Sequence, residues 1–83
     1  MEPETLFFAG SAHPALGWAV ATALGMPLAA CRIERFPDGE VSVRIERAVH
    51  GHEVVLLQSL APPADTNLME LLVFAEAARR AGA

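Results

Sequence analysis

The first third of the chain predicts a strand followed by a helix. Residues 6–10, LFFAG, form a short apolar run ended by a glycine, which is typical of a buried strand. In residues 11–25 the apolar side chains recur at helical spacing, with Ser11 as a candidate cap and Pro14 in the first turn. Gly25 suits the position that follows the last turn. The expected apolar face of this helix comprises Leu16, Ala19, Val20, Ala23 and Leu24.

The middle of the chain predicts two strands joined by a tight turn. Residues 27–36 read as the first strand, and the turn Pro37-Asp38-Gly39 follows it. After the turn, three apolar residues alternate with polar ones, so that all three share one face. We therefore expect an antiparallel hairpin whose inward side chains are Val41, Val43 and Ile45.

The last third predicts a central strand and a second helix. Residues 54–59, VVLLQS, are largely apolar, as expected of a strand that is covered on both faces. After a loop with two prolines, a helix is expected from about Asn67 to Arg80. Asn67 and Glu70 have the spacing of a capping box, in which the two side chains bond each other's backbone N–H groups. The expected apolar stripe comprises Leu68, Leu71, Leu72 and Ala75.

The predicted order of elements is β-α-β-β-β-α, which indicates an α/β fold whose sheet is mostly parallel with one antiparallel hairpin. In such a fold another strand should follow the last helix, yet the sequence stops at residue 83. We therefore expect residues 1–83 to form an incomplete domain.

Composition limits the classes of function. The 83 residues are 53% hydrophobic and only 19% charged, so we expect either self-association or a larger parent protein. The net charge is −4 and no basic cluster is present, which argues against a nucleic-acid partner. No apolar run reaches the roughly 18 residues of a membrane span, and the acidic start MEPET lacks the basic region of a signal peptide, so we expect a cytoplasmic protein without membrane contacts.

Several polar residues are candidates for chemistry, and a structural role is favoured for each. Residues 10–12 lie between a strand and a helix, where free N–H groups can bind phosphate, but a tight turn capped by Ser11 is the better interpretation. We likewise favour a structural His13, a solvated turn for His50 and His52, which lack a third metal ligand, and a buried structural thiol for Cys31. Capping similarly accounts for Asp65 and Asn67, although these two residues and Glu70 could also form a polar site. No catalytic residue and no metal ligand is predicted.

The turn after residue 35 is different, because turn chemistry does not explain all of it. Asp38 and Gly39 suit a turn, whereas Phe36 and Glu40 are not turn residues. An aromatic ring flanked by the carboxylates of Asp38 and Glu40 suits a flat heterocycle with an exocyclic amine, such as adenine. The alternative is a hairpin whose phenylalanine packs on a neighbouring part of the protein.

Four segments together resemble the N-terminal portion of ribose-phosphate pyrophosphokinases, also called phosphoribosyl pyrophosphate synthetases. The resemblance covers nearly the whole chain from Leu6 to Ala83, and its most specific parts are the R-F-x-D-G-E and N-L-M-E-L segments. Pro37 departs from the commoner small polar residue of the family's turn. The segments are FAGSAHPALG, RFPDGEVSVRI, VVLLQS and TNLMELLVFAEAARRAGA.

The resemblance implies a partial, Rossmann-like domain of the phosphoribosyltransferase type. The family transfers pyrophosphate from ATP to ribose 5-phosphate with Mg²⁺, and its members form homo-oligomers. It implies that Phe36, Asp38 and Glu40 contact the adenine of an ATP bound to a neighbouring subunit. The family's phosphate, metal and ribose-phosphate motifs are absent from these 83 residues, so the chain alone should be inactive and should bind no cofactor firmly. A non-catalytic assembly or regulatory module of the same family, or a purely structural self-associating fragment, are the alternatives.

Overall fold

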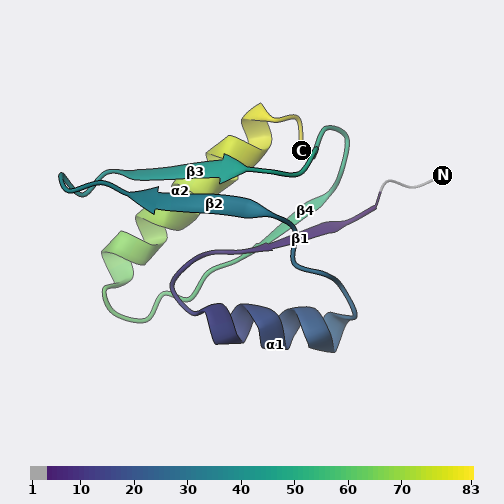
Figure 1. Ribbon diagram of the computed structural model, residues 1–83, viewed down its shortest axis with the longest axis horizontal. Helices are drawn as coiled ribbons and strands as arrows, with labels where there is room; N and C mark the ends of the chain where they lie inside the picture. The colour runs from purple at the N-terminus through teal and green to yellow at the C-terminus, as the bar shows by residue number, and fades with distance from the viewer. Residues whose placement is uncertain (1–3) are drawn as a thin grey trace.

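The computed structural model describes residues 4–83, and the six predicted elements appear in the predicted order. This confirms the α/β fold class (Figure 1). The acidic start of the chain, residues 1–3, lies outside the described residues. The elements are β1 (Leu6–Ala9), α1 (Pro14–Leu24), β2 (Cys31–Arg35), β3 (Val41–Ile45), β4 (Val54–Leu57) and α2 (Ala64–Arg80).

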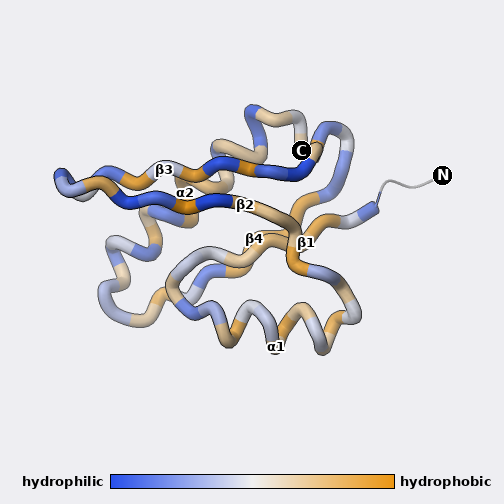
Figure 2. The backbone as a smooth tube through the Cα atoms, viewed as in Figure 1, coloured by the Kyte–Doolittle hydropathy of each residue, from blue (hydrophilic) through white to orange (hydrophobic). Residues whose placement is uncertain are grey.

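The strands form a parallel pair and an antiparallel pair. β1 lies parallel to β4, with Leu6 opposite Val54, and β2 lies antiparallel to β3. A parallel bridge between Phe7 and Leu28 joins the segment before β2 to β1, and the Ala29 N–H donates to the Phe7 carbonyl at 2.7 Å. The hairpin therefore continues the twisted surface that the parallel pair begins. Figure 2 shows the result: apolar β1 and β4, and alternating polar and apolar positions along the hairpin.

The main core lies between α2 and the strands. Phe8 of β1 is fully buried, and its ring meets that of Phe74 in α2 edge-on, with 5.6 Å between the ring centroids. Leu6 and Val49 complete the buried cluster. The predicted inward face of the hairpin is confirmed, because Val43 and Ile45 pack against this cluster and Val41 is half-buried. α2 thus covers both strand pairs, while α1 packs against β1 (Figure 1).

The predicted apolar face of α1 is wrong. Gly17 and Ala21 are buried, whereas Leu16 and Leu24 are exposed. A Cβ atom on Gly17 would lie 2.8 Å from the Cβ of Ala9, so only glycine lets α1 approach β1 this closely. The predicted cap is wrong as well, since the Nδ1 of His13, rather than Ser11, accepts from the backbone N–H of Leu16 at 3.0 Å. The left-handed Gly25 at the end of the helix is confirmed by its φ of 66°.

The predicted start and apolar face of α2 are also wrong. The helix begins at Ala64, one turn earlier than expected, so Asn67 and Glu70 lie inside it and form no capping box. Its buried residues are Asn67, Glu70, Phe74 and Ala78, whereas Leu68 and Leu72 are exposed. Two polar residues occupy core positions because each has hydrogen-bond partners there, and the large apolar residues beside them face outward.

β4 is less covered than a central strand should be. Among the described strands it pairs with β1 alone, and Val55 is 40% exposed. The expectation of a strand buried on both faces is therefore not met within residues 4–83. No helix in this part of the chain is long and apolar enough to cross a membrane.

Candidate functional site

The backbone hydrogen bonds of the turn between β2 and β3 are formed within the turn itself. The Phe36 N–H donates to the Glu40 carbonyl at 2.9 Å, and the Gly39 N–H donates to the Phe36 carbonyl at 2.9 Å. Asp38 Oδ1 accepts from the Glu40 N–H at 3.0 Å. Gly39 has a φ of 89°, which a residue with a side chain adopts only with strain. Backbone groups, Asp38 and Gly39 thus build the turn without help from the side chains of Phe36 and Glu40.

The side chains of the turn lie together at an exposed end of the molecule. Phe36 is 45% exposed, and Asp38 and Glu40 are exposed beside it. Among residues 4–83 the carboxylate of Glu40 has no hydrogen-bond or ion-pair partner. The tip of the hairpin projects away from the chain termini (Figure 1). The turn therefore exposes an aromatic ring and two carboxylates at the surface. Such a ring can stack on the face of a base such as adenine, and carboxylates can accept hydrogen bonds from its N–H groups.

A second polar cluster lies beneath the hairpin, and it joins Glu70 to Ser11, Arg35 and Gln58 rather than to Asp65 and Asn67, with which the sequence suggested a polar site. The carboxylate of Glu70 is fully buried and accepts four hydrogen bonds. Ser11 donates its N–H at 2.7 Å and its hydroxyl at 2.5 Å, Arg35 donates Nη2 at 2.6 Å, and Gln58 donates Nε2 at 2.8 Å. A buried carboxylate is costly unless it is fully bonded, and here each oxygen receives two donors.

This cluster decides between the two interpretations of residues 10–12. The N–H of Ser11 is bonded to Glu70, and the N–H of Ala12 donates to Gln58 Oε1 at 3.3 Å. The backbone groups that could bind a phosphate are therefore occupied by side chains of the same chain. A Cβ atom on Gly10 would overlap the Gln58 amide and would lie 2.8 Å from Glu70 Oε2, so the loop is also packed tightly against the cluster. The structural interpretation is favoured, although Ser11 acts through Glu70 and not as a helix cap.

The other candidates lie on separate loops and strands. His50 packs beside Gly82, and His52 Nδ1 lies 2.8 Å from the Glu4 carbonyl oxygen. Within residues 4–83, no group of three or more His, Cys, Asp or Glu side chains lies close enough together to hold a metal ion. Cys31 is half-buried on the inward face of β2, where burial, aided by the charges of Glu46 and Glu70, raises the pKa of its thiol. A raised pKa favours the less reactive protonated thiol.

A shallow, largely apolar cleft of about 340 Å³ lies between β4 and the last turns of α2. The imidazole of His52 is among the side chains that line it, and the cleft lies away from the hairpin tip.

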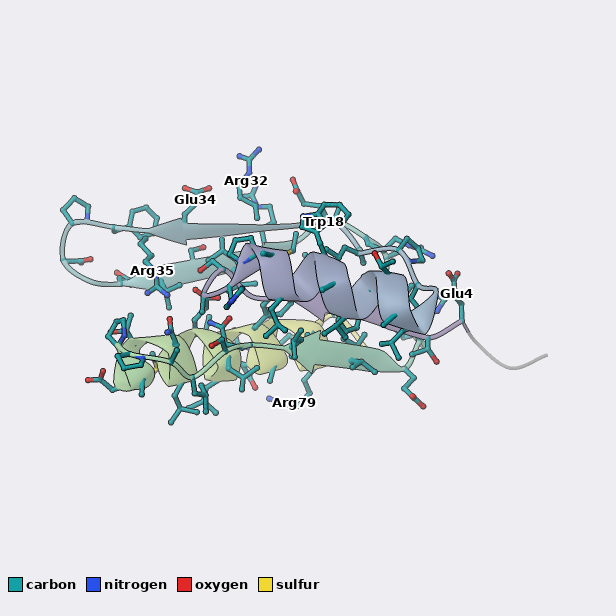
Figure 3. The ribbon with its side chains drawn as sticks, turned by 90° about the horizontal axis from the view of Figure 1, so that it is seen from below. Glu4, Trp18, Arg32, Glu34, Arg35 and Arg79 are labelled. Carbon is teal, nitrogen blue, oxygen red and sulfur yellow. The ribbon has the colours of Figure 1, made fainter. Side chains whose placement is uncertain are left out.

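One signal in the sequence points to the buried cluster. Cys31, Ile33 and Arg35 are alternate residues of β2, so an arginine takes the third inward position of this strand. Figure 3 shows Arg35 pointing toward α2, whereas Arg32 and Glu34 point away from it. A positive charge on an inward face calls for a buried acidic partner. Nothing in the local spacing identifies Glu70 as that partner.

Comparison with known proteins gives one consistent result. The family described as the N-terminal domain of ribose phosphate pyrophosphokinase matches residues 5–83. Ribose-phosphate pyrophosphokinase 1 of Spinacia oleracea is 46% identical over 76 residues, which are 92% of this chain and 23% of the relative. The ribose-phosphate pyrophosphokinase of Thermotoga maritima is 42% identical over 80 residues, which are 96% of this chain and 25% of the relative.

The fold agrees with a solved structure. Phosphoribosylpyrophosphate synthetase from Mycobacterium smegmatis superposes with a TM-score of 0.92 and 36% identity, over 96% of this chain and 27% of that protein. The chain thus spans about a quarter of the length of the proteins that it resembles.

The Glu70 cluster leads to a prediction about stability. Replacing Glu70→Ala removes the acceptor of the Ser11 N–H and hydroxyl and of the Arg35 guanidinium, and it leaves Gln58 Nε2 with only the Asn67 carbonyl at 3.3 Å. We expect this to lower the free energy of unfolding by about 3 kcal/mol or more, measured by urea denaturation of the 83-residue chain. Glu34→Ala is the matched control, because Glu34 is exposed on the outer face of β2, and it should change stability by less than about 0.5 kcal/mol. Equal losses in the two variants would contradict the role given to Glu70.

Proposed function

The chain belongs to the family of the N-terminal domain of ribose phosphate pyrophosphokinase, and we propose that it forms the incomplete N-terminal domain of an enzyme that transfers pyrophosphate from ATP to ribose 5-phosphate. The product would be phosphoribosyl pyrophosphate, a precursor in nucleotide biosynthesis, and AMP would be released. The names and lengths of the relatives support this proposal. A cytoplasmic location belongs to the same proposal, although some plant relatives are named as chloroplastic.

Within this enzyme we propose that the hairpin tip binds the adenine of ATP. The ring of Phe36 would stack on the base, and the carboxylates of Asp38 and Glu40 would accept hydrogen bonds from its N–H groups. The observation that carries the proposal is the turn itself, which holds its shape by backbone bonds and leaves these side chains exposed together. Asp38 retains one carboxylate oxygen outside the turn's own hydrogen bonds.

We propose further that the ATP belongs to a neighbouring subunit of a homo-oligomer. The turn lies at one end of an elongated molecule of 44 × 28 × 16 Å, and a single ring with two carboxylates forms only one wall of a pocket. The remaining walls would come from the partner. The Mg²⁺ that accompanies ATP would also be held elsewhere, and we assign no residue of this chain to it.

The adenine contact predicts a selective effect on ATP binding. In the full-length enzyme that carries this chain, Phe36→Ala should raise the apparent KM for ATP at least about fivefold, because stacking on an aromatic ring contributes about 1–3 kcal/mol per base. The KM for ribose 5-phosphate should not change. Leu60→Ala is the control, since Leu60 is a large exposed apolar residue outside the proposed site and outside the faces proposed for self-association. Unchanged ATP kinetics in Phe36→Ala would remove Phe36 from the site.

The 83-residue chain alone should be inactive. It carries one wall of an adenine pocket and none of the groups proposed to hold the triphosphate, the metal ion or the ribose phosphate. A coupled assay of AMP release with ATP, Mg²⁺ and ribose 5-phosphate should therefore give no signal above the enzyme-free background. The full-length enzyme under the same conditions is the positive control. Turnover by the short chain would contradict the proposal.

The isolated chain should self-associate. Both helices expose apolar side chains to the outside, and burying them in a contact between copies is favourable. Light scattering at micromolar concentrations should give a mass above the 8.8 kDa of one chain. A mass of one chain throughout a dilution series would count against it. The exposed residues are Leu16, Trp18 and Leu24 of α1 and Leu68, Met69 and Leu72 of α2.

A further inference from the structure

The buried carboxylate and the exposed turn are joined by a single residue. Arg35 is the last residue of β2, it is paired with Val41 across the hairpin, and Phe36 follows it directly. Its guanidinium donates to Glu70 at 2.6 Å. Because Glu70 lies in α2 and is fully buried, Arg35 connects the base of the turn to the interior of the molecule.

Among residues 4–83, the bond from Arg35 to Glu70 is the side-chain hydrogen bond to α2 nearest the tip of the hairpin, and Val41 opposite Arg35 is half-buried. The apolar anchors on the inward face of the hairpin are Ile33 and Val43, which are paired with each other, and Cys31 and Ile45, which lie further from the turn. Residues 36–40 are all exposed, and their backbone hydrogen bonds stay within the turn. We call the hydrogen bond between Arg35 and Glu70 the tether. Without it, β2 and β3 could change their twist and bend relative to α2, as two-stranded ribbons do readily.

Glu70 is held rigidly enough to act as the fixed point of the tether. Its other three hydrogen bonds come from Ser11, in the loop before α1, and from Gln58, just after β4. The carboxylate therefore cannot follow a moving arginine without breaking bonds to two further segments. An arginine–carboxylate hydrogen bond between charged groups is also shorter and stronger than a neutral one.

We propose that Arg35 and Glu70 are positioning residues for nucleotide binding, which together fix where the turn places the ring of Phe36. This inference rests on the proposed function of Phe36. Glu70 is fully buried, so it can act only through the residues that it contacts. Arg35 is bonded directly to Phe36, so the position of Arg35 limits the position of the turn. The contact between Arg35 and the buried Glu70 thus sets the position of the exposed Phe36 ring.

The test uses Arg35→Met in the full-length enzyme, since methionine keeps an unbranched side chain and removes the charge and the donors. We expect the apparent KM for ATP to rise about fivefold, as if most of the stacking contact were lost. The KM for ribose 5-phosphate and kcat at saturating ATP should not change. Arg35→Lys, which restores a charged donor, should recover most of the ATP affinity. Failure of the lysine variant to recover any affinity would contradict a tether based on charge and hydrogen bonding.

Arg32→Met is the matched control. Arg32 lies in the same strand, carries the same charge and has a side chain 59% exposed, but it points away from α2, and its guanidinium lies 4.0 Å from the carboxylate of Glu34 (Figure 3). The control should leave the ATP kinetics unchanged. An equal effect of both substitutions would show a general effect of charge and would overturn the positioning role.

The double variant Arg35→Met with Phe36→Ala separates positioning from direct contact. If Arg35 acts only by placing Phe36, the double variant should have the same KM for ATP as Phe36→Ala alone. A further rise of fivefold would mean that Arg35 touches the nucleotide itself, and the inference would be wrong. If Phe36→Ala alone had no effect, the proposed function of Phe36 would fail first.

Hydrogen exchange provides a readout that does not depend on ATP. In the nucleotide-free enzyme, peptides that contain residues 36–40 should exchange faster in Arg35→Met than in the wild type, because the turn is released from α2. Arg32→Met should leave this exchange unchanged. Unaltered exchange in Arg35→Met would overturn the tether even if the kinetic constants changed.

Discussion

The arrangement of this chain depends on one buried carboxylate. Removing the charge of Glu70 from water is costly, and the cost is offset only while four donors remain in contact with its two oxygens. Those donors belong to the loop before α1, to the hairpin and to the segment after β4. If one of these segments moved relative to α2, the carboxylate of Glu70 would lose a donor while it remained buried, or it would become exposed to water. Glu70 therefore contributes to a single arrangement of the elements as well as to stability.

The occupied loop before α1 illustrates this effect. A junction between a parallel strand and a helix normally offers free N–H groups to an anion. Here the anion is the side chain of Glu70, supplied by a helix 59 residues further along the chain. The loop thereby helps to assemble the fold, and the exposed residues of the candidate site lie instead on the hairpin turn at the end of the molecule.

The sequence predicts the order of the elements and the hairpin well, because period-two alternation and turn residues are local signals. It does not predict which faces of the helices are buried. In α1 the inward positions belong to Gly17 and Ala21, because close approach to β1 requires small residues. In α2 they include Asn67 and Glu70, whose burial depends on partners between 6 and 59 residues away. Such partners become visible only when distant segments are brought together. The exposed turn, in contrast, is a local feature, and its three side chains are found where the sequence places them.

The closed hydrogen bonds of the turn have a consequence for how this protein can change over evolutionary time. Among residues 4–83, the hydrogen bonds of the turn use only backbone groups of Phe36 and Glu40, and both residues are exposed. Substitutions at these two positions should therefore carry little folding penalty. If the turn binds a ligand as proposed, its ligand preference can change one residue at a time, while selection for a stable interior acts on other residues.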